Sequence, residues 1–345
     1  MLKIFRKVAF FVRGIFHLNY IEQLLEESRQ ILKESIYLLN RLKGVYDEDL
    51  KFLVDHMKVY DDRLKALVDV RKDVTSFRSD IEELLKVVEV RFALLNEKLN
   101  SYFRLIDDKY GIFPRREITL TTEHPLAEYS DDYKFPRGAK NDNTHCLRFV
   151  RKCEDIFGRK VSYLDLGCAG GGLVLDFLSR GNFAVGLEGS DYPSKNVTGE
   201  WSLIDRYLFN CDITKEFKIM DTKTGRIYKF DVIGLWEVFE HIPEEFLPQL
   251  MTNIKNHLKK DGLLAASIAV FRDEDKELGA VYHVNVKDKE WWKEFFENSG
   301  FELVDGLFEI EDFPRGSGNR SRVRDWSAIE NPELGFHIVA KLKKE

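Results

Sequence analysis

The stretch YLDLGCAGGG, Tyr163–Gly172, joins a short apolar run to a loop unusually rich in glycine. The run contains an acid, Asp165, and four glycines follow between Gly167 and Gly172. Glycine has no Cβ atom, so a loop of this kind lets the backbone pass close to a ligand. In a sheet of parallel strands, ligands bind beyond the carboxyl ends of the strands. We therefore expect a ligand site directly after this strand.

Strand and helix patterns alternate on both sides of this stretch. Strands are predicted over 161–166, 184–187, 207–210, 230–236, 263–269, 301–307 and 336–342, and helices over 171–179, 244–258 and 289–299. Such alternation predicts an α/β fold with a parallel, doubly wound sheet and helices on both faces.

The glycine pattern helps to select the ligand. A second acid, Glu188, ends the next predicted strand, where its carboxylate can accept hydrogen bonds from a ribose diol. A dinucleotide fingerprint requires G-x-G-x-x-G, but the matching positions are Gly167, Ala169 and Gly172. The missing second glycine is the one that admits a pyrophosphate. The loop therefore favours a nucleoside cofactor other than a dinucleotide.

The pattern D-x-G-x-A-x-G, followed by an acid at the end of the second strand, resembles motifs I and II of the class I S-adenosylmethionine-dependent methyltransferases. Further matches follow in order at Asn210-Cys211-Asp212 and at the segments 230–236, 237–242 and 258–263. The resemblance covers roughly residues 140–342. It implies a seven-stranded Rossmann-like methyltransferase sheet, S-adenosylmethionine as the cofactor, and methyl transfer as the activity.

The resemblance also implies roles for individual residues. The glycine loop would hold the methionyl-ribose part of the cofactor, Glu188 the ribose, and Asp212 the adenine. The residues expected at the cofactor are Asp165, Gly167, Cys168, Ala169, Gly170, Gly171, Glu188, Asp212 and Trp236.

Carboxylates and histidines follow the fourth and fifth of the predicted strands. Glu237, Glu240 and His241 are spaced to lie on one helical turn, and His283 comes after the fifth strand. The four would bind Mg²⁺ or another divalent metal, an arrangement similar to that of small-RNA 3′-end 2′-O-methyltransferases and ubiquinone-pathway O-methyltransferases. The alternative is a metal-free site in which His283 is the general base. His241, His283 and Glu237 are the catalytic candidates under these two hypotheses.

Two polar segments, 136–143 and 313–320, are rich in guanidinium and amide groups. Such donors suit a hydroxyl-rich or phosphorylated acceptor. The acceptor-binding candidates are Arg137, Asn141, Asn143, Arg315 and Asn319. The alternative is that both segments are ordered surface loops.

The first 110 residues differ in composition and in the spacing of their apolar residues. The first proline is Pro114, and apolar residues keep a heptad spacing from Leu25 to Ile106, which predicts a long α-helical coiled coil over 21–110 that self-associates. An antiparallel hairpin that folds back near Gly44 is the alternative. Residues 1–20 are basic and amphipathic, and either lie in a membrane interface or cap the coiled coil. Residues 111–345 form the expected methyltransferase domain.

Overall composition limits the classes of partner. The net charge is −6, which argues against nucleic acid as a partner. The four cysteines form no CxxC pair, and no apolar run approaches the ~20 residues that span a bilayer. We expect a cytoplasmic protein, with peripheral contact to the inner face of a membrane through residues 1–20. Three functions stay open: O-methylation of a saccharide or surface-glycan precursor, metal-dependent RNA ribose 2′-O-methylation, and a coiled-coil scaffold with a non-catalytic cofactor domain.

Overall fold

The structure is a computed structural model of the 345-residue chain, and it describes residues 86–87, 90–91, 100–317 and 326–344. The chain divides into two compact units, Met1–Asn96 and Glu97–Glu345. The expected helix at residues 1–20 and the pairing of the expected coiled coil lie outside the described residues. The second unit begins before residue 111, because it takes in a helix over residues 100–110. Arg104 of this helix forms an ion pair with Asp205 at 3.0 Å.

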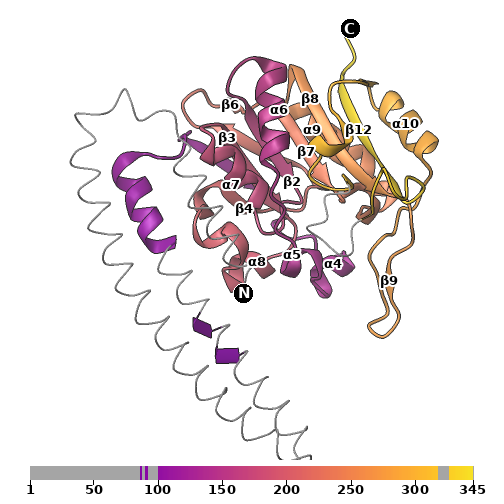
Figure 1. The fold of residues 1–345 in the computed structure, drawn as a ribbon, viewed down its shortest axis with the longest axis horizontal. Coiled ribbons are helices and arrows are strands. Elements are labelled where there is room, and N and C mark those ends of the chain that lie inside the picture. Colours follow the sequence, from indigo (N-terminus) through magenta and orange to yellow (C-terminus); the bar gives the residue numbers. More distant parts are fainter. Residues whose placement is uncertain (1–85, 88–89, 92–99, 318–325, 345) are drawn as a thin grey trace, which may run out of the picture. The chain divides into compact units, whose positions relative to one another are not determined.

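A seven-stranded sheet forms the centre of the second unit (Figure 1). The strand order is β11-β12-β8-β7-β2-β3-β4, which corresponds to Phe301–Leu303, Gly335–Leu342, Leu258–Ala269, Phe230–Trp236, Ser162–Leu166, Phe183–Glu188 and Leu208–Asn210. The strands from β8 to β4 pair parallel with their neighbours, whereas β12 is antiparallel to both β8 and β11. The expected seven-stranded α/β sheet is confirmed, and it departs from the expected parallel arrangement at β12.

The direction of β12 follows from the connection that leads to it. Parallel neighbours need a long crossover, usually a helix, to carry the chain back across the sheet. In the described part of the connection 304–334, the helical structure is limited to the 3-10 helix η6, Ile310–Asp312. The chain therefore enters the sheet in the opposite direction, between β11 and β8.

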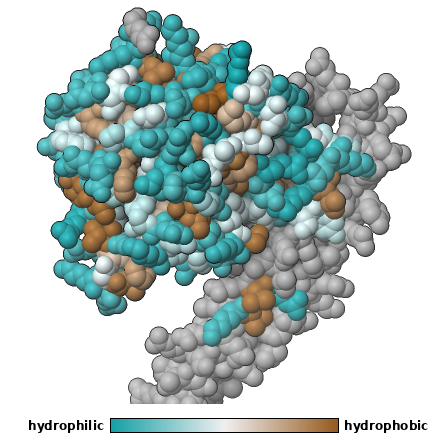
Figure 2. Space-filling model, turned by 180° about the vertical axis from the view of Figure 1, so that it is seen from behind, coloured by the Kyte–Doolittle hydropathy of each residue, from teal (hydrophilic) through white to brown (hydrophobic). Residues whose placement is uncertain are grey.

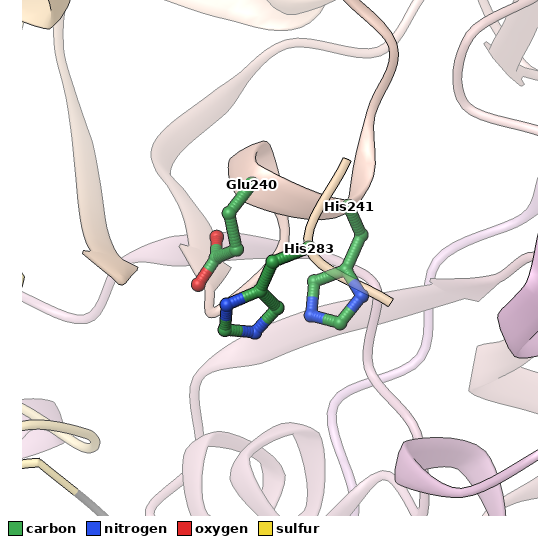
Figure 3. Close-up of side chains that lie close together, drawn as sticks. All are labelled: Glu240, His241 and His283. Carbon is green, nitrogen blue, oxygen red and sulfur yellow. The ribbon is translucent and has the colours of Figure 1, made fainter. Parts of the chain in front are cut away.

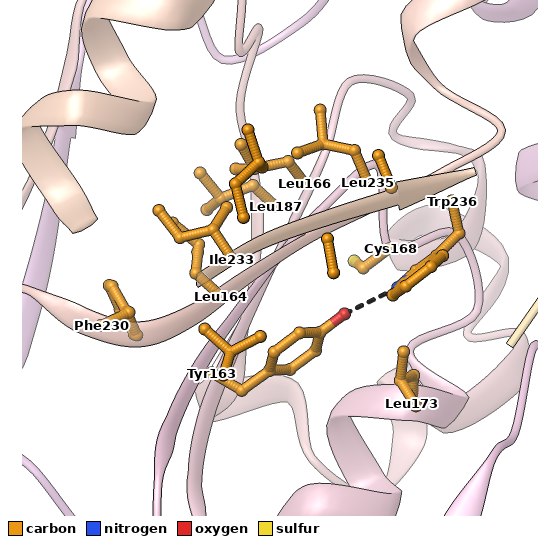
Figure 4. Close-up of a cluster of buried hydrophobic side chains, with 14 of the residues drawn as sticks. Tyr163, Leu164, Leu166, Cys168, Leu173, Leu187, Phe230, Ile233, Leu235 and Trp236 are labelled. Carbon is orange, nitrogen blue, oxygen red and sulfur yellow. Dashed lines mark hydrogen bonds between the residues drawn. The ribbon is translucent and has the colours of Figure 1, made fainter. Parts of the chain in front are cut away.

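Strands β2 and β7 lie at the centre of the core, and every residue of both is buried. Their register pairs Tyr163 with Val232 and Asp165 with Gly234. Apolar side chains on both faces are what a central parallel strand requires. Figure 4 shows side chains of β2, β3 and β7 packed together in this cluster.

The strand order reverses between β2 and β7. The chain leaves β2 through α7 (Gly172–Ser179) toward β3, and it leaves β7 through α9 (Leu247–His257) toward β8. Right-handed crossovers that run in opposite directions place their helices on opposite faces of the sheet. Helix α6 (Leu147–Phe157) packs on α7, and α10 (Lys289–Asn298) packs on β11 and β12. The carboxyl ends of β2 and β7 thus border a switch point, where ligands bind in open α/β sheets.

Shorter elements surround this sheet. A three-stranded antiparallel sheet contains β1 (Ile118–Thr122), β5 (Phe217–Asp221) and β6 (Arg226–Ile227), and a hairpin contains β9 (Glu274–Asp275) and β10 (Ala280–Val281). The short helices are α4 (Asp131–Lys134), α5 (Gly138–Asn141), α8 (Tyr192–Asn196), η2 (Gly199–Ser202), η3 (Asp205–Tyr207), η4 (Phe239–His241) and η5 (Glu244–Phe246).

Hydrophilic side chains cover most of the described surface on the face shown in Figure 2, and apolar ones lie in small separate groups. Among the described residues, none of the helices is both long and apolar enough to cross a bilayer.

Candidate active site

The glycine loop after β2 contains three residues with left-handed backbone conformations. Gly167 and Gly171 have φ values of 80° and 83°, and Ala169 between them has a φ of 44°. The amides of Gly167 and Cys168 both donate to the carbonyl oxygen of Leu187, at 2.8 and 3.0 Å. Backbone hydrogen bonds therefore fix the loop at the carboxyl ends of β2 and β3.

Gly170 allows a preceding segment to lie directly on this loop. Its amide donates to the carbonyl oxygen of Asp142 at 3.0 Å, and a Cβ atom at Gly170 would lie 2.7 Å from Oδ1 of Asn143. That Oδ1 atom is buried and has no hydrogen-bond partner. A buried acceptor without a partner costs free energy unless a ligand supplies a donor. The loop therefore fits a ligand that carries ammonium or hydroxyl donors.

Glu188 at the end of β3 fastens the same loop through its carboxylate. Oε2 accepts a hydrogen bond from the Ala169 amide at 2.8 Å, and Oε1 accepts one from the Ser190 amide at 2.9 Å. Each oxygen keeps a second lone pair for a ligand hydroxyl. Burial raises the pKa of the Glu188 carboxyl above its usual value. This arrangement fits the ribose-binding role that the resemblance implies.

Asp165 is supported by two aromatic side chains. The indole N–H of Trp236 donates to the Tyr163 hydroxyl at 2.9 Å (Figure 4), and that hydroxyl donates to Oδ1 of Asp165 at 2.9 Å. Burial raises the pKa of Asp165 to about 7. Trp236, expected at the cofactor, thus acts on Asp165 through Tyr163.

Two further cofactor candidates, Asp212 and Cys168, are buried. Asp212 is 2% exposed, and its Oδ1 accepts hydrogen bonds from the amide and hydroxyl of Thr214 at 2.9 and 2.6 Å. Cys168 packs against β3, where a Cβ atom on Gly186 would lie 2.7 Å from its sulfur. Cys168 therefore contacts Gly186 and Leu187 of β3.

The expected helical turn that begins at Glu237 is wrong. Glu237 has a φ of 58°, and helical structure starts only at η4, Phe239–His241. The Oε2 atom of Glu237 accepts a hydrogen bond from the indole N–H of Trp326 at 2.8 Å. The left-handed residue breaks the i, i+3 and i+4 spacing, so Glu237 does not share a helical face with Glu240 and His241.

The other three predicted metal ligands do converge. Figure 3 shows the side chains of Glu240, His241 and His283 close together, and one ligand atom from each lies within 4.8 Å of the others. Oε1 of Glu240 accepts a hydrogen bond from the Ala269 amide at 2.9 Å, whereas its Oε2 is buried without a hydrogen-bond partner. The amide of Val284 donates to the Glu240 carbonyl at 2.9 Å, which ties the His283 segment to η4.

The hydrogen bonds of the two imidazoles set their protonation. Nδ1 of His283 lies 2.7 Å from the carbonyl oxygen of Phe271, and Nδ1 of His241 lies 2.7 Å from Oδ2 of Asp132. Because both partners are acceptors, each Nδ1 carries the proton, and Nε2 of a neutral ring offers a lone pair. Asp132 was not among the residues predicted from the sequence.

The charges of the three groups are coupled. Burial and the neighbouring His241 lower the pKa of His283 to about 4. Burial alone would lower the pKa of His241, but the Asp132 carboxylate raises it to about 9. Burial and nearby Glu237 raise the pKa of Glu240 well above its usual value. A carboxylate and two imidazoles in this setting would bind a divalent cation in exchange for the protons that His241 and Glu240 hold, or His283 would accept a proton.

The predicted acceptor-binding arginines contact protein carboxylates. Both terminal nitrogens of Arg137 bond the carboxylate of Asp273, and its guanidinium lies over the ring of Tyr282 at 3.9 Å. Arg315 forms an ion pair with Asp142 at 3.0 Å. These two ion pairs link the 136–143 segment to Asp273 and to Arg315. Asp273 was not predicted, because nothing in the sequence marks it as the partner of Arg137.

The predicted asparagines also bond within the protein. The side-chain amide of Asn143 donates to Oε1 of Glu200 at 2.9 Å, and that of Asn141 donates to the Arg137 carbonyl at 3.0 Å. Asn319 lies outside the described residues. The side-chain donors of Arg137, Asn141 and Asn143 are therefore engaged within the protein, whereas Oδ1 of Asn143 is a buried hydrogen-bond acceptor without a partner next to Gly170.

Comparison with known proteins identifies a methyltransferase domain in this chain. Residues 139–306 match the family model of a methyltransferase domain. A relative described as a ubiquinone biosynthesis O-methyltransferase, from Glaesserella parasuis serovar 5 (strain SH0165), is 32% identical over 123 residues, which cover 34% of this chain and 48% of the relative. The chain thus spans about half the length of the curated relative that it matches.

Solved methyltransferase structures show a weaker likeness. The glycopeptide N-methyltransferase MtfA with sinefungin gives a TM-score of 0.39 at 13% identity, over 57% of this chain and 94% of that one. A 1,6-didemethyltoxoflavin-N1-methyltransferase from Burkholderia thailandensis gives 0.40 at 15% identity, over 63% and 87%. An S-adenosylmethionine-dependent methyltransferase from Clostridium acetobutylicum gives 0.40 at 13% identity, over 63% and 98%.

The assignment depends on the family match and the local geometry. The matched range contains the glycine loop, the acid at the end of β3 and the switch point of the sheet. The expected class and cofactor are thereby confirmed. Residues 139–306 of the second unit are therefore a methyltransferase domain that uses S-adenosylmethionine.

Proposed function

We propose that the chain transfers the methyl group of S-adenosylmethionine to a hydroxyl oxygen of a saccharide or a surface-glycan precursor. The convergence of Glu240, His241 and His283 beside the ends of β7 and β8 carries this proposal. A hydroxyl is a poor nucleophile until its proton is removed, and this cluster offers two ways to do so. The cofactor loop would hold the methyl donor, and the cluster would activate the acceptor hydroxyl.

Methyl transfer to oxygen is an in-line displacement. The acceptor oxygen forms a bond to the methyl carbon, the carbon–sulfur bond breaks with its electron pair going to sulfur, and the hydroxyl proton leaves. When bound, S-adenosylmethionine supplies a methyl group on a positively charged sulfur. Glu188 would hold its ribose hydroxyls, and Asp165 and Asn143 Oδ1 would accept hydrogen bonds from donors nearer the glycine loop. Alignment of this kind is worth up to about 7–11 kcal/mol in ideal cases.

The cluster fits a divalent metal. Glu240 would bind it through the buried Oε2 atom that has no hydrogen-bond partner, and His241 and His283 would bind it through Nε2. A divalent cation bound there would lower the pKa of a coordinated hydroxyl. Two imidazoles and one carboxylate suit Mn²⁺ or Zn²⁺ better than Mg²⁺, which prefers oxygen ligands.

A metal-free reaction is the second candidate, and one observation favours it. His283 has a pKa of about 4, so its Nε2 atom is unprotonated at neutral pH. An acceptor hydroxyl within hydrogen-bond reach of that atom would pass its proton to His283 as the bond to the methyl carbon forms.

The number of protein ligands supports the proposed choice of acceptor. Three ligands leave coordination positions that two neighbouring hydroxyl oxygens of one molecule would fill. Saccharides offer such vicinal diols. The matching relative is named as an O-methyltransferase, which supports oxygen as the acceptor atom. A net charge of −6 does not favour a polyanionic acceptor such as RNA.

The cellular setting is proposed on sequence grounds. The heptad pattern over 21–110 supports self-association, and the basic residues 1–20 support contact with the inner face of a membrane. A surface-glycan precursor at that membrane would meet a cytoplasmic enzyme there. Sedimentation of the full chain with and without anionic vesicles tests both contacts.

The function is tested with cofactor labelled in its methyl group. The purified chain is incubated with saccharides that carry vicinal diols, an ortho-diphenol, and a short RNA with a free 3′ ribose. We expect label on a saccharide, loss of label with EDTA, and recovery with Mn²⁺. Label only on the diphenol or the RNA would refute the saccharide acceptor, and label that resists EDTA would favour His283 as the base. Absence of label on every acceptor would count against the proposal, and Glu188→Ala serves as the cofactor-deficient control.

A further inference from the structure

We infer that Asp132 of α4 is a positioning residue that orients His241 in the metal site. This inference rests on the proposed metal site of Glu240, His241 and His283. Asp132 itself is not a member of the converging ligand group. It acts on the site through the imidazole of His241.

The contact between Asp132 and His241 joins distant parts of the chain. Oδ2 of Asp132 lies 2.7 Å from Nδ1 of His241, and 109 positions separate the two residues. Their side chains are 28% and 20% exposed, so the bond is partly shielded from water. This distance is typical of a strong hydrogen bond between an N–H group and a carboxylate.

Helix α4 is itself held in place on both sides of Asp132. The Ser130 hydroxyl caps the helix by accepting from the Asp132 amide at 3.1 Å. Oδ2 of Asp131 accepts from the Val281 amide at 3.0 Å. The Tyr282 hydroxyl donates to the carbonyl of Phe135 at 3.2 Å. The helix is therefore fastened to the segment that carries His283.

The chemical effect of Asp132 is to choose which imidazole nitrogen is free. A metal-bound imidazole is neutral and carries one proton, and the carboxylate holds that proton on Nδ1. The lone pair is then on Nε2, and the ring cannot rotate without losing the bond to Asp132. His283 is held in the same way by the Phe271 carbonyl. Both rings thus present Nε2, with ring centroids 4.9 Å apart at an interplanar angle of 78°.

Carboxylates that bond a metal-binding histidine in this manner typically contribute 10- to 100-fold to metal affinity. Asp132 would contribute in the same way, by fixing the orientation of His241 and raising its basicity. Its contribution would appear in metal affinity before it appears in cofactor affinity.

Mn²⁺ binding to the full chain tests this inference, because free Mn²⁺ is measured directly by electron paramagnetic resonance. Asp132→Asn is compared with Asp131→Asn, which removes the same charge from the adjacent residue of α4. The two parent side chains are 28% and 27% exposed, and an asparagine at 131 still accepts the Val281 hydrogen bond. We expect Asp132→Asn to weaken Mn²⁺ binding about 10- to 100-fold and Asp131→Asn to leave it within about 3-fold.

The outcomes separate the inference from the function on which it rests. Equal Mn²⁺ affinity in the wild type and Asp132→Asn would overturn the role of Asp132 and leave the metal site standing. Absence of Mn²⁺ binding in the wild type would overturn the metal site and this inference together. Equal weakening by Asp131→Asn would show that the charge of α4 matters and not the bond to His241. Binding of S-adenosylhomocysteine and the unfolding temperature are measured for each variant, and a loss in both would assign a purely structural role to Asp132.

Discussion

The cofactor side and the acceptor side of the site are built in different ways. On the cofactor side, a backbone loop and the carboxylate at the next strand end lie on adjacent parallel strands. On the acceptor side, side chains from α4, η4 and the segment after β10 meet. The first side needs only two neighbouring strands in register, whereas the second needs three segments folded onto one another. We therefore expect substitutions to affect the two sides separately.

Loss of Glu240, the carboxylate of the proposed metal site, should have the largest effect. Glu240→Gln removes the charge of the one carboxylate in the cluster, and we expect Mn²⁺ affinity to fall by about 1,000-fold, more than loss of a residue that only supports a ligand. Affinity for S-adenosylmethionine should stay within about 3-fold of the wild type, as calorimetry would show. Glu245→Gln, at an exposed residue of η5, is the control. A similar loss of S-adenosylmethionine affinity in Glu240→Gln would contradict the expectation that substitutions affect the two sides separately.

The reciprocal substitution is Glu188→Ala. It removes a carboxylate that binds two backbone amides of the cofactor side, and hydrogen bonds to charged groups are worth about 1.5–3 kcal/mol each. We expect cofactor affinity to fall about 100- to 1,000-fold and Mn²⁺ affinity to stay unchanged. Glu188→Gln keeps the shape of the side chain and should lose less. Unchanged cofactor affinity in Glu188→Ala would refute the placement of the cofactor.

Acid should disable both sides at once, because they share one core. His257 is fully buried, its Nε2 accepts from the Ile219 amide at 3.0 Å, and burial lowers its pKa to about 4. The unfolded chain binds this proton near pH 6.5, so the stabilisation is complete above that pH and is lost as pH falls toward 4. We expect about 3 kcal/mol of unfolding free energy to disappear over this range.

Denaturant unfolding at several pH values measures this loss. His257→Gln should have a shallower pH dependence than the wild type, and the difference between the two isolates His257 from the other buried histidines. Identical pH dependence in both proteins would contradict the assignment. Cofactor and Mn²⁺ binding should disappear in the same transition, and separate transitions would show that the two sides do not share a core.

The smallest predicted effect concerns the support of Asp165. Tyr163→Phe removes the hydroxyl that bonds Trp236 and Asp165, and leaves two buried polar groups with one partner fewer. We expect a loss of about 1–3 kcal/mol in the free energy of unfolding, measured by denaturant titration. Cofactor affinity should change more than Mn²⁺ affinity, since Asp165 belongs to the cofactor side. The opposite order would contradict the network.

This contrast also explains how much of the molecule could be predicted. Glycine positions and the acids at strand ends are local signals, so the seven strands, the glycine loop and Glu188 were predictable from residue order. The direction of β12 was not, because periodicity does not report whether a connection carries a helix. In the three-stranded sheet, β1 pairs with β5, which follows it by about 100 positions, and β5 pairs with the nearby β6. These strands are short, and their residue pattern was too weak to predict them.

The acceptor side was predictable in residue type but not in geometry. Two histidines and two carboxylates were identified, yet a left-handed backbone at Glu237 separates it from the others. Asp132 and Asp273 reach the site only through tertiary contacts, which spacing along the chain does not encode. Arg137 and Arg315, which were predicted to bind an acceptor, instead bond Asp273 and Asp142, because a guanidinium pairs readily with a nearby carboxylate.

The central claim is that the glycine loop and Glu188 form an S-adenosylmethionine site. Calorimetric titration of S-adenosylmethionine, and separately of NADH, into the purified chain tests it most directly. We predict saturable, stoichiometric binding of S-adenosylmethionine that Glu188→Ala weakens about 100-fold or more, and no heat of binding with NADH. Binding of NADH, or failure of S-adenosylmethionine to bind, would contradict the account.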